Sequence, residues 1–148
     1  MASVTEINSK LRELNNKRER HSPQEVSDEL STILAKLMTD CGDIAGAMIS
    51  STDGHAQAQK LDGELDYQRF AAMSSALLAL SDTLISETQQ GDTKNILLES
   101  ESRNIFVMHA GNQLLLTVFS KPSSNLGMSL AYARKAAEEI SRMDIEIS

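Results

Sequence analysis

The segment YQRFAAMSSALLALSDTLISETQQ, residues 67–90, is the longest stretch of uninterrupted helical periodicity in this chain. It contains no charged residue between Phe70 and Ser81, whereas a helix at a domain surface normally carries a charged outer side. At about 100° per residue, its larger apolar residues cover roughly half the circumference, more than one contact with a sheet requires. These residues are Phe70, Met73, Leu77, Leu78, Leu80, Leu84 and Ile85. We expect this arc to cover the sheet of its own domain.

The opposite arc of the same helix carries small residues instead of charged ones, which leaves room for another protein surface to approach closely. A helix buried on all sides of a larger monomer would show the same pattern. However, 148 residues provide too small a core to surround a helix in this way. The arc therefore predicts contact with another chain. Its members are Ala72, Ser75, Ala76, Ala79, Thr83 and Ser86.

The composition predicts one domain with a core of aliphatic residues, since the chain has no Trp and seven Met. A net charge of -7 opposes binding to nucleic acid, which requires clustered Lys and Arg. The single cysteine, Cys41, fits a reducing compartment, and no apolar run approaches the length that spans a membrane. We therefore expect a soluble, cytoplasmic protein that neither inserts into membranes nor binds nucleic acid.

Residues 1–21 are predicted to form an N-terminal amphipathic extension and a linker. Apolar residues recur at heptad spacing over residues 3–15, which predicts a short helix, although two heptads are marginal for a helix without a packing partner. The polar, basic run over residues 15–21 is typical of a solvated linker. The apolar positions of the extension are Val4, Ile7, Leu11 and Leu14.

Residues 22–148 are predicted to form the folded domain. Its first helix begins at Ser22-Pro23-Gln24-Glu25, which combines an N-cap serine, proline at the first helical position and glutamate at the third. Asp53-Gly54 predicts a hairpin with a type I′ turn, which needs two positive φ angles. Strands are expected at residues 44–51, 55–61, 96–100, 104–110 and 113–120, and a last helix at residues 126–143.

The strands around Phe106 and Leu115 are apolar at successive positions, whereas a sheet with one wet side should alternate. Helices must therefore cover both faces of the sheet. We expect the central helix on one face and the first and last helices of the domain on the other. The predicted fold is mixed, α/β in the broad sense and α+β in detail, with the order α-β-β-α-β-β-β-α.

No catalytic signature is present in the sequence. Gly91-Asp92-Thr93-Lys94 lacks the spacing of a phosphate-binding loop, and no Gly-x-Ser-x-Gly elbow occurs. His21, His55 and His109 show no spacing that indicates shared metal ligation. We therefore expect a protein that is not an enzyme and that holds neither a cofactor nor a metal.

Three stretches carry a resemblance to a known family. Residues 44–54, IAGAMISSTDG, resemble the opening hairpin of the Roadblock family, which is named for dynein light chains and is common among bacterial regulators. Residues 69–80, RFAAMSSALLAL, resemble its central helix, and residues 125–128, NLGM, resemble the turn into its last helix. The similarity covers about residues 24–142. It implies a profilin-like architecture, a five-stranded antiparallel sheet between helices, and a homodimer joined through the third strand and central helix.

The resemblance also implies a partner. Bacterial members of the family commonly bind Ras-like GTPases, including the polarity GTPase of gliding bacteria, whose activator inserts no arginine finger. Our hypothesis is therefore a non-enzymatic, homodimeric adaptor that binds a Ras-like small GTPase and modulates its GTPase cycle, with activation of hydrolysis as one form of that role. The alternatives are a small-molecule sensor or a purely structural scaffold of the same fold. Scarce aromatic residues argue against an internal ligand pocket.

These expectations assign residues to two surfaces. The GTPase is expected to contact the small-residue arc of the central helix and its polar flanks: Arg69, Ala72, Ala76, Ala79 and Thr83. The dimer is expected to form through the third strand and neighbouring helix positions: Leu78, Ile85, Ile96, Leu97 and Leu98.

Overall fold

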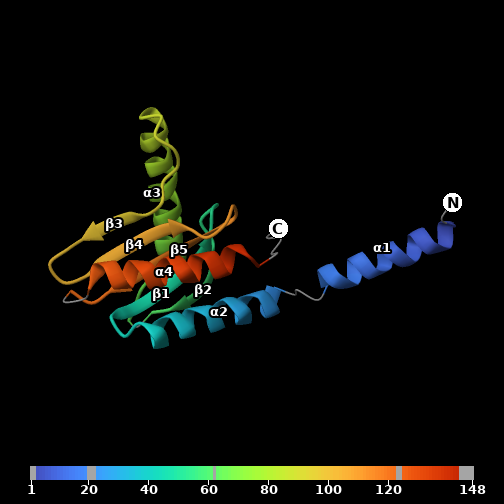
Figure 1. The fold of residues 1–148 in the computed structure, drawn as a ribbon. Coiled ribbons are helices and arrows are strands. Elements are labelled where there is room, and N and C mark those ends of the chain that lie inside the picture. The colour runs from blue at the N-terminus through green and yellow to red at the C-terminus, as the bar shows by residue number, and fades with distance from the viewer. Residues whose placement is uncertain (1–2, 20–22, 62, 123–124, 144–148) are drawn as a thin grey trace.

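The computed structural model describes residues 3–19, 23–61, 63–122 and 125–143. After the helix of the extension, the elements follow the predicted order (Figure 1). They are α1 (Val4–Glu19), α2 (Pro23–Asp40), β1 (Ile44–Ser51), β2 (Ala56–Lys60), α3 (Tyr67–Glu87), β3 (Ile96–Glu99), β4 (Asn104–His109), β5 (Leu114–Ser120) and α4 (Leu126–Ser141).

The five strands form one antiparallel sheet in the order β2-β1-β5-β4-β3. β5 lies in the middle, and every residue in it is buried because neighbouring strands flank it and helices cover both faces. β2 and β3 are the edge strands. The predicted mixed fold, with helices on both faces of the sheet, is confirmed.

The larger core lies between the sheet and the pair α2 and α4, which pack side by side on one face (Figure 1). Alternating side chains of β1, β4 and β5 point into it, together with apolar side chains of both helices. Its buried members include Leu30, Leu34, Leu37, Cys41, Leu116, Val118, Ala133, Ala137 and Ile140.

A smaller core lies on the opposite face, under α3. Leu78 of α3 packs there with Val107 and Leu115 of the sheet. Nearer the start of the helix, the Phe70 and Phe119 rings lie with their centroids 5.2 Å apart. The C-terminal half of α3 extends beyond the sheet (Figure 1). One helix, α3, therefore covers this face of the sheet, whereas α2 and α4 cover the other.

The N-terminal helix α1 differs from the prediction in its length. It runs to Glu19, so Asn15 to Glu19 are helical, and our assignment of this run to a linker was wrong. Lys17, Arg18 and Glu19 favour helix by intrinsic propensity, which explains the extension. Figure 1 shows α1 away from the sheet. The predicted cap at Ser22 lies outside the described residues.

The described apolar side chains of α1 do not contribute to the core. Val4 is 75% exposed, and Ile7 and Leu11 are about half exposed. Among the described helices, none is long and apolar enough to cross a membrane.

The turn between β1 and β2 also differs from the prediction. Gly54 has φ of 94°, but Asp53 does not have a positive φ, so the turn is not of type I′. The Gly54 N–H donates to the Ser51 carbonyl at 3.0 Å, which closes a four-residue turn with glycine at its left-handed position. A Cβ at Gly54 would lie only 3.2 Å from the Cα of Ala72. Glycine therefore allows this turn to lie directly against α3.

We expect residues 1–20 to be dispensable for folding of the remaining chain. Because the described apolar side chains of α1 are exposed, deleting residues 1–20 should shift the thermal unfolding midpoint by only about 2 °C. The contrasting variant is Leu34→Ala, which removes a fully buried side chain from the larger core and should cost about 3 kcal/mol of unfolding free energy. Calorimetry measures both effects. Loss of soluble protein on truncation would show that α1 belongs to the fold.

Candidate functional site

The helix α3 begins and ends at identifiable signals. The Asp66 carboxylate accepts a hydrogen bond from the Arg69 backbone N–H at 3.1 Å, so Asp66 is the N-cap of the helix. The helix ends at Glu87, three residues before the predicted end, and Gln89 then takes a positive φ of 56°. A left-handed residue cannot continue a right-handed helix, so the chain turns there towards β3.

The side of α3 that faces the sheet carries two small residues beside a leucine. Ala71 and Ser74 are buried with Leu78. Their short side chains let the helix backbone lie close to the sheet, and the Ser75 hydroxyl donates to the carbonyl of Thr52 in the adjacent turn. These contacts fix the rotation of α3 about its own axis.

This rotation corrects the expectation that the large apolar arc covers the sheet. Met73, Leu80 and Leu84 are 51%, 58% and 61% exposed, and they point to solvent. The sequence indicated the wide apolar arc but not which part of it meets the sheet, because both arcs of the helix lack charge. These three residues are therefore site candidates that the sequence analysis had assigned to the core.

The small residues predicted to contact a partner lie on the same solvent side. Arg69, Ala72, Ala76, Ala79 and Thr83 are all exposed. At about 100° per residue they form a stripe next to that of Met73, Leu80 and Leu84. We call these eight residues the α3 outer face. It carries one charged side chain, Arg69, over roughly four helical turns.

The edge strand β3 adds a second exposed apolar surface. Leu97 and Leu98 are each 41% exposed, and Ile96 is half-buried. Leu97 stands opposite Phe106 and Leu98 opposite Ile105, so their side chains lie on opposite faces of the sheet. The structure therefore brings the three predicted β3 residues together at an open edge.

The other two predicted interface residues lie elsewhere. Leu78 is 2% exposed and belongs to the core of its own chain with Val107 and Leu115. Its assignment to a dimer interface is therefore corrected, since a side chain covered by its own sheet offers no surface to a second copy. Ile85 is half-buried near the C-terminal end of α3.

One ion pair ties the projecting half of α3 to the sheet. The His109 Nε2 atom at the end of β4 lies 2.9 Å from the Asp82 Oδ2 atom. Partial burial raises the pKa of Asp82, but the nearby polar groups of Thr93, the hydrogen bond with His109 and the charge of His109 outweigh burial and leave the pKa below its usual 3.8. His109, for which the sequence indicated no role in metal binding, thus helps to hold α3 in place.

The described residues of α3 and β3 offer an exposed apolar surface. Within residues 3–19, 23–61, 63–122 and 125–143, no group of three or more His, Cys, Asp or Glu could hold a metal ion. The distinguishing feature of this side of the molecule is exposed apolar area on α3 and β3, which in soluble proteins marks interaction sites.

Sequence comparison finds a matching domain family and related proteins. A family model of the Roadblock/LC7 domain matches residues 30–120. An uncharacterized protein of Methanocaldococcus jannaschii is 29% identical over 100 residues, which cover 68% of this chain and 87% of the relative.

Solved structures show the same fold. One described as MglB with tetrameric arrangement has a TM-score of 0.73 at 17% identity, covering 79% of this chain and 88% of that one. The gliding protein MglB of Thermus thermophilus has a TM-score of 0.71 at 18% identity, covering 82% and 90%. Profilin IA of Acanthamoeba castellanii has a TM-score of 0.58 at 12% identity, covering 75% and 95%, so the fold is profilin-like.

The Asp82–His109 pair predicts a loss of stability in acid. Because the pKa of Asp82 is lower in the folded protein than in the unfolded chain, its contribution is complete above the unfolded value near 3.8 and is lost as the pH falls through the folded value. Asp82→Asn should therefore lower the thermal unfolding midpoint at pH 5 to 6, and the difference from wild type should shrink below pH 4. The exposed loop residue Asp92 gives the control, Asp92→Asn. Equal midpoints for Asp82→Asn and wild type across this range would contradict a structural role for the pair.

Proposed function

Because the chain belongs to the Roadblock/LC7 domain family, we propose that it is a homodimeric adaptor that binds a Ras-like small GTPase and modulates its GTPase cycle. In this proposal the protein catalyses no reaction itself. Two surfaces have separate roles: the β3 edge joins two copies of the chain, and the α3 outer face binds the GTPase.

The homodimer is supported by the open edge of the sheet. β3 is short, apolar and exposed, and an uncovered edge of this kind is a template for pairing with another strand. Pairing with the same strand of a second copy closes both edges under two-fold symmetry. It also continues the sheet from one copy into the other.

The observation that carries the GTPase proposal is the α3 outer face. A solvent-exposed helix with Met, Leu, Ala and Thr over roughly four turns and one arginine is suited to bury against a protein surface. The adjacent small residues allow a partner to approach the helix backbone. The family resemblance supplies the class of partner, since bacterial members commonly bind Ras-like GTPases.

The mode of regulation follows from the same surface. Arg69, in the first turn of α3, is the one arginine of the α3 outer face. The rest of the α3 outer face offers no arginine for insertion into a nucleotide site. Any stimulation of hydrolysis should therefore come from ordering the catalytic residues of the GTPase itself.

The test is a binding titration of the small GTPase from the same organism, loaded with a non-hydrolysable GTP analogue or with GDP. Ala76→Arg places a long charged side chain in the α3 outer face and should weaken binding of the GTP form by at least about tenfold, because it blocks close approach. The matched control is Ala131→Arg, an exposed alanine of α4 on the other side of the sheet, which should bind like wild type.

Two outcomes would contradict the proposal. Unchanged binding by Ala76→Arg would place the partner on another surface. Equal affinity for the GTP and GDP forms would leave a scaffold that does not respond to the GTPase cycle, which is the alternative role considered from the sequence.

A further inference from the structure

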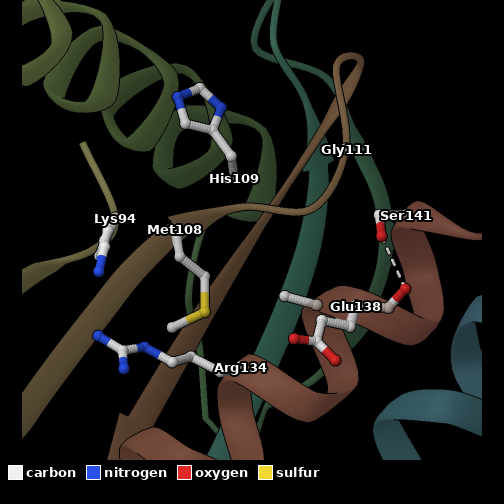
Figure 2. Close-up of a pocket in the computed structure, with 8 residues that line it drawn as sticks. Lys94, Met108, His109, Gly111, Arg134, Glu138 and Ser141 are labelled. Carbon is white, nitrogen blue, oxygen red and sulfur yellow. Dashed lines mark hydrogen bonds between the residues drawn. The ribbon is translucent and has the colours of Figure 1, made fainter. Parts of the chain in front are cut away.

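A pocket lies at the end of β4 beside α4, away from the α3 outer face (Figure 2). Its volume is about 360 Å³. Lys94, Met108 and His109 contribute from the sheet side, and Arg134 and Glu138 contribute from α4. The pocket belongs neither to the β3 edge nor to the α3 outer face.

The backbone of His109 is unpaired at this pocket. The Ala110 N–H donates to the Leu114 carbonyl in β5, and backbone groups of successive residues in a strand point to alternate sides. The backbone groups of His109 therefore point to the β3 side. The β3–β4 register pairs Ile96 with Val107, so the next rung would join Lys94 to His109.

That rung is missing. β3 begins at Ile96, and among the described residues no backbone hydrogen bond joins Lys94 to His109. The N–H and the carbonyl of His109 are thus left as one donor and one acceptor at an open strand edge. Unpaired edge groups of this kind are the element that an added strand recognises.

The His109 side chain does not fill the pocket. Its ring points towards α3, where it pairs with Asp82 (Figure 2). Met108 is 2% exposed, and its side chain points between the sheet and α4. The pocket therefore has a strand edge and an apolar floor.

Two cations flank this edge. The side chains of Lys94 and Arg134 extend on the same side of Met108 (Figure 2). The Arg134 Nη2 atom donates to the Asn95 Oδ1 atom at 2.7 Å, which orients the guanidinium beside the segment that leads into β3. Glu138 on the next turn of α4 lies 3.9 Å from Arg142. The pocket is thus locally cationic in a chain whose net charge is -7.

We propose that this pocket binds an extended acidic peptide segment. The segment supplies the missing rung by pairing its backbone with His109, and it places a carboxylate between Lys94 and Arg134. A simple anion would use the cations but not the strand edge, and a neutral strand would leave the cations unused. Only an acidic extended segment satisfies both, because guanidinium and ammonium groups form charge-assisted hydrogen bonds with carboxylates.

The experiment follows backbone amide resonances of the ¹⁵N-labelled full chain during titration with the peptide acetyl-Val-Thr-Glu-Val-Thr-amide. We expect saturable shifts centred on His109 and Gly111. The same peptide with Gln in place of Glu should bind about fivefold more weakly, because it loses an exposed charge-assisted contact. A peptide N-methylated at the residue that pairs with His109 keeps its charge but should lose binding.

Variants locate the contacts. Arg134→Gln and Lys94→Gln should each weaken binding of the Glu peptide about threefold, while Lys135→Gln, the neighbouring exposed cation of α4, should not. Glu138→Gln should strengthen binding because it removes the opposing carboxylate. Thermal unfolding midpoints equal to wild type show that each variant is folded.

Three results would overturn the proposal. The first is the absence of shifts at millimolar peptide. The second is equal affinity for the Glu, Gln and N-methylated peptides. The third is that sodium acetate produces the same shifts at the same concentration, which would leave a site for simple anions without strand pairing.

Discussion

The sheet has two apolar faces, and the two faces are covered by different numbers of helices. α2 and α4 together cover one face, and α3 alone covers the other. Because Ala71 and Ser74 let α3 lie close to the sheet, one narrow side of the helix is enough for the inner contact. The remaining apolar side chains of α3 then face solvent. The packing of α3 on the sheet therefore determines which apolar residues of this helix are exposed.

The same arrangement explains why α3 needs additional attachments. Its N-terminal half is held by the hydrogen bond between Ser75 and Thr52 and by the close approach of Gly54 to Ala72. Its C-terminal half extends beyond the sheet, where the Asp82–His109 pair connects it to β4. A helix anchored at both halves can present a rigid outer face, and rigidity lowers the entropic cost of binding.

Much of the fold could be predicted from the sequence because it rests on local patterns. The stripes of α2 and α4, the Asp66 cap and the apolar runs of β4 and β5 each indicate an element directly. The rotation of α3 could not be predicted, since its stretch from Phe70 to Ser81 carries no charged residue that would mark the solvent side. Leu78 and Leu80 differ by two positions and have the same chemistry, yet one is buried and the other exposed. Likewise, the gap opposite His109 depends on where β3 begins, which no local pattern specifies.

The central claim is that the open edge of β3 is closed by a second copy of the chain. In one copy, the backbone groups of Ile96 and Leu98 face β4, while those of Leu97 and Glu99 face the open edge. Amide hydrogen exchange resolved by NMR separates these residues. If two copies pair through β3, the Leu97 and Glu99 amides should be as protected as those of Ile96 and Leu98 in concentrated samples and should lose protection on dilution. Unprotected exchange of Leu97 and Glu99 at every concentration, with Ile96 and Leu98 protected, would contradict it.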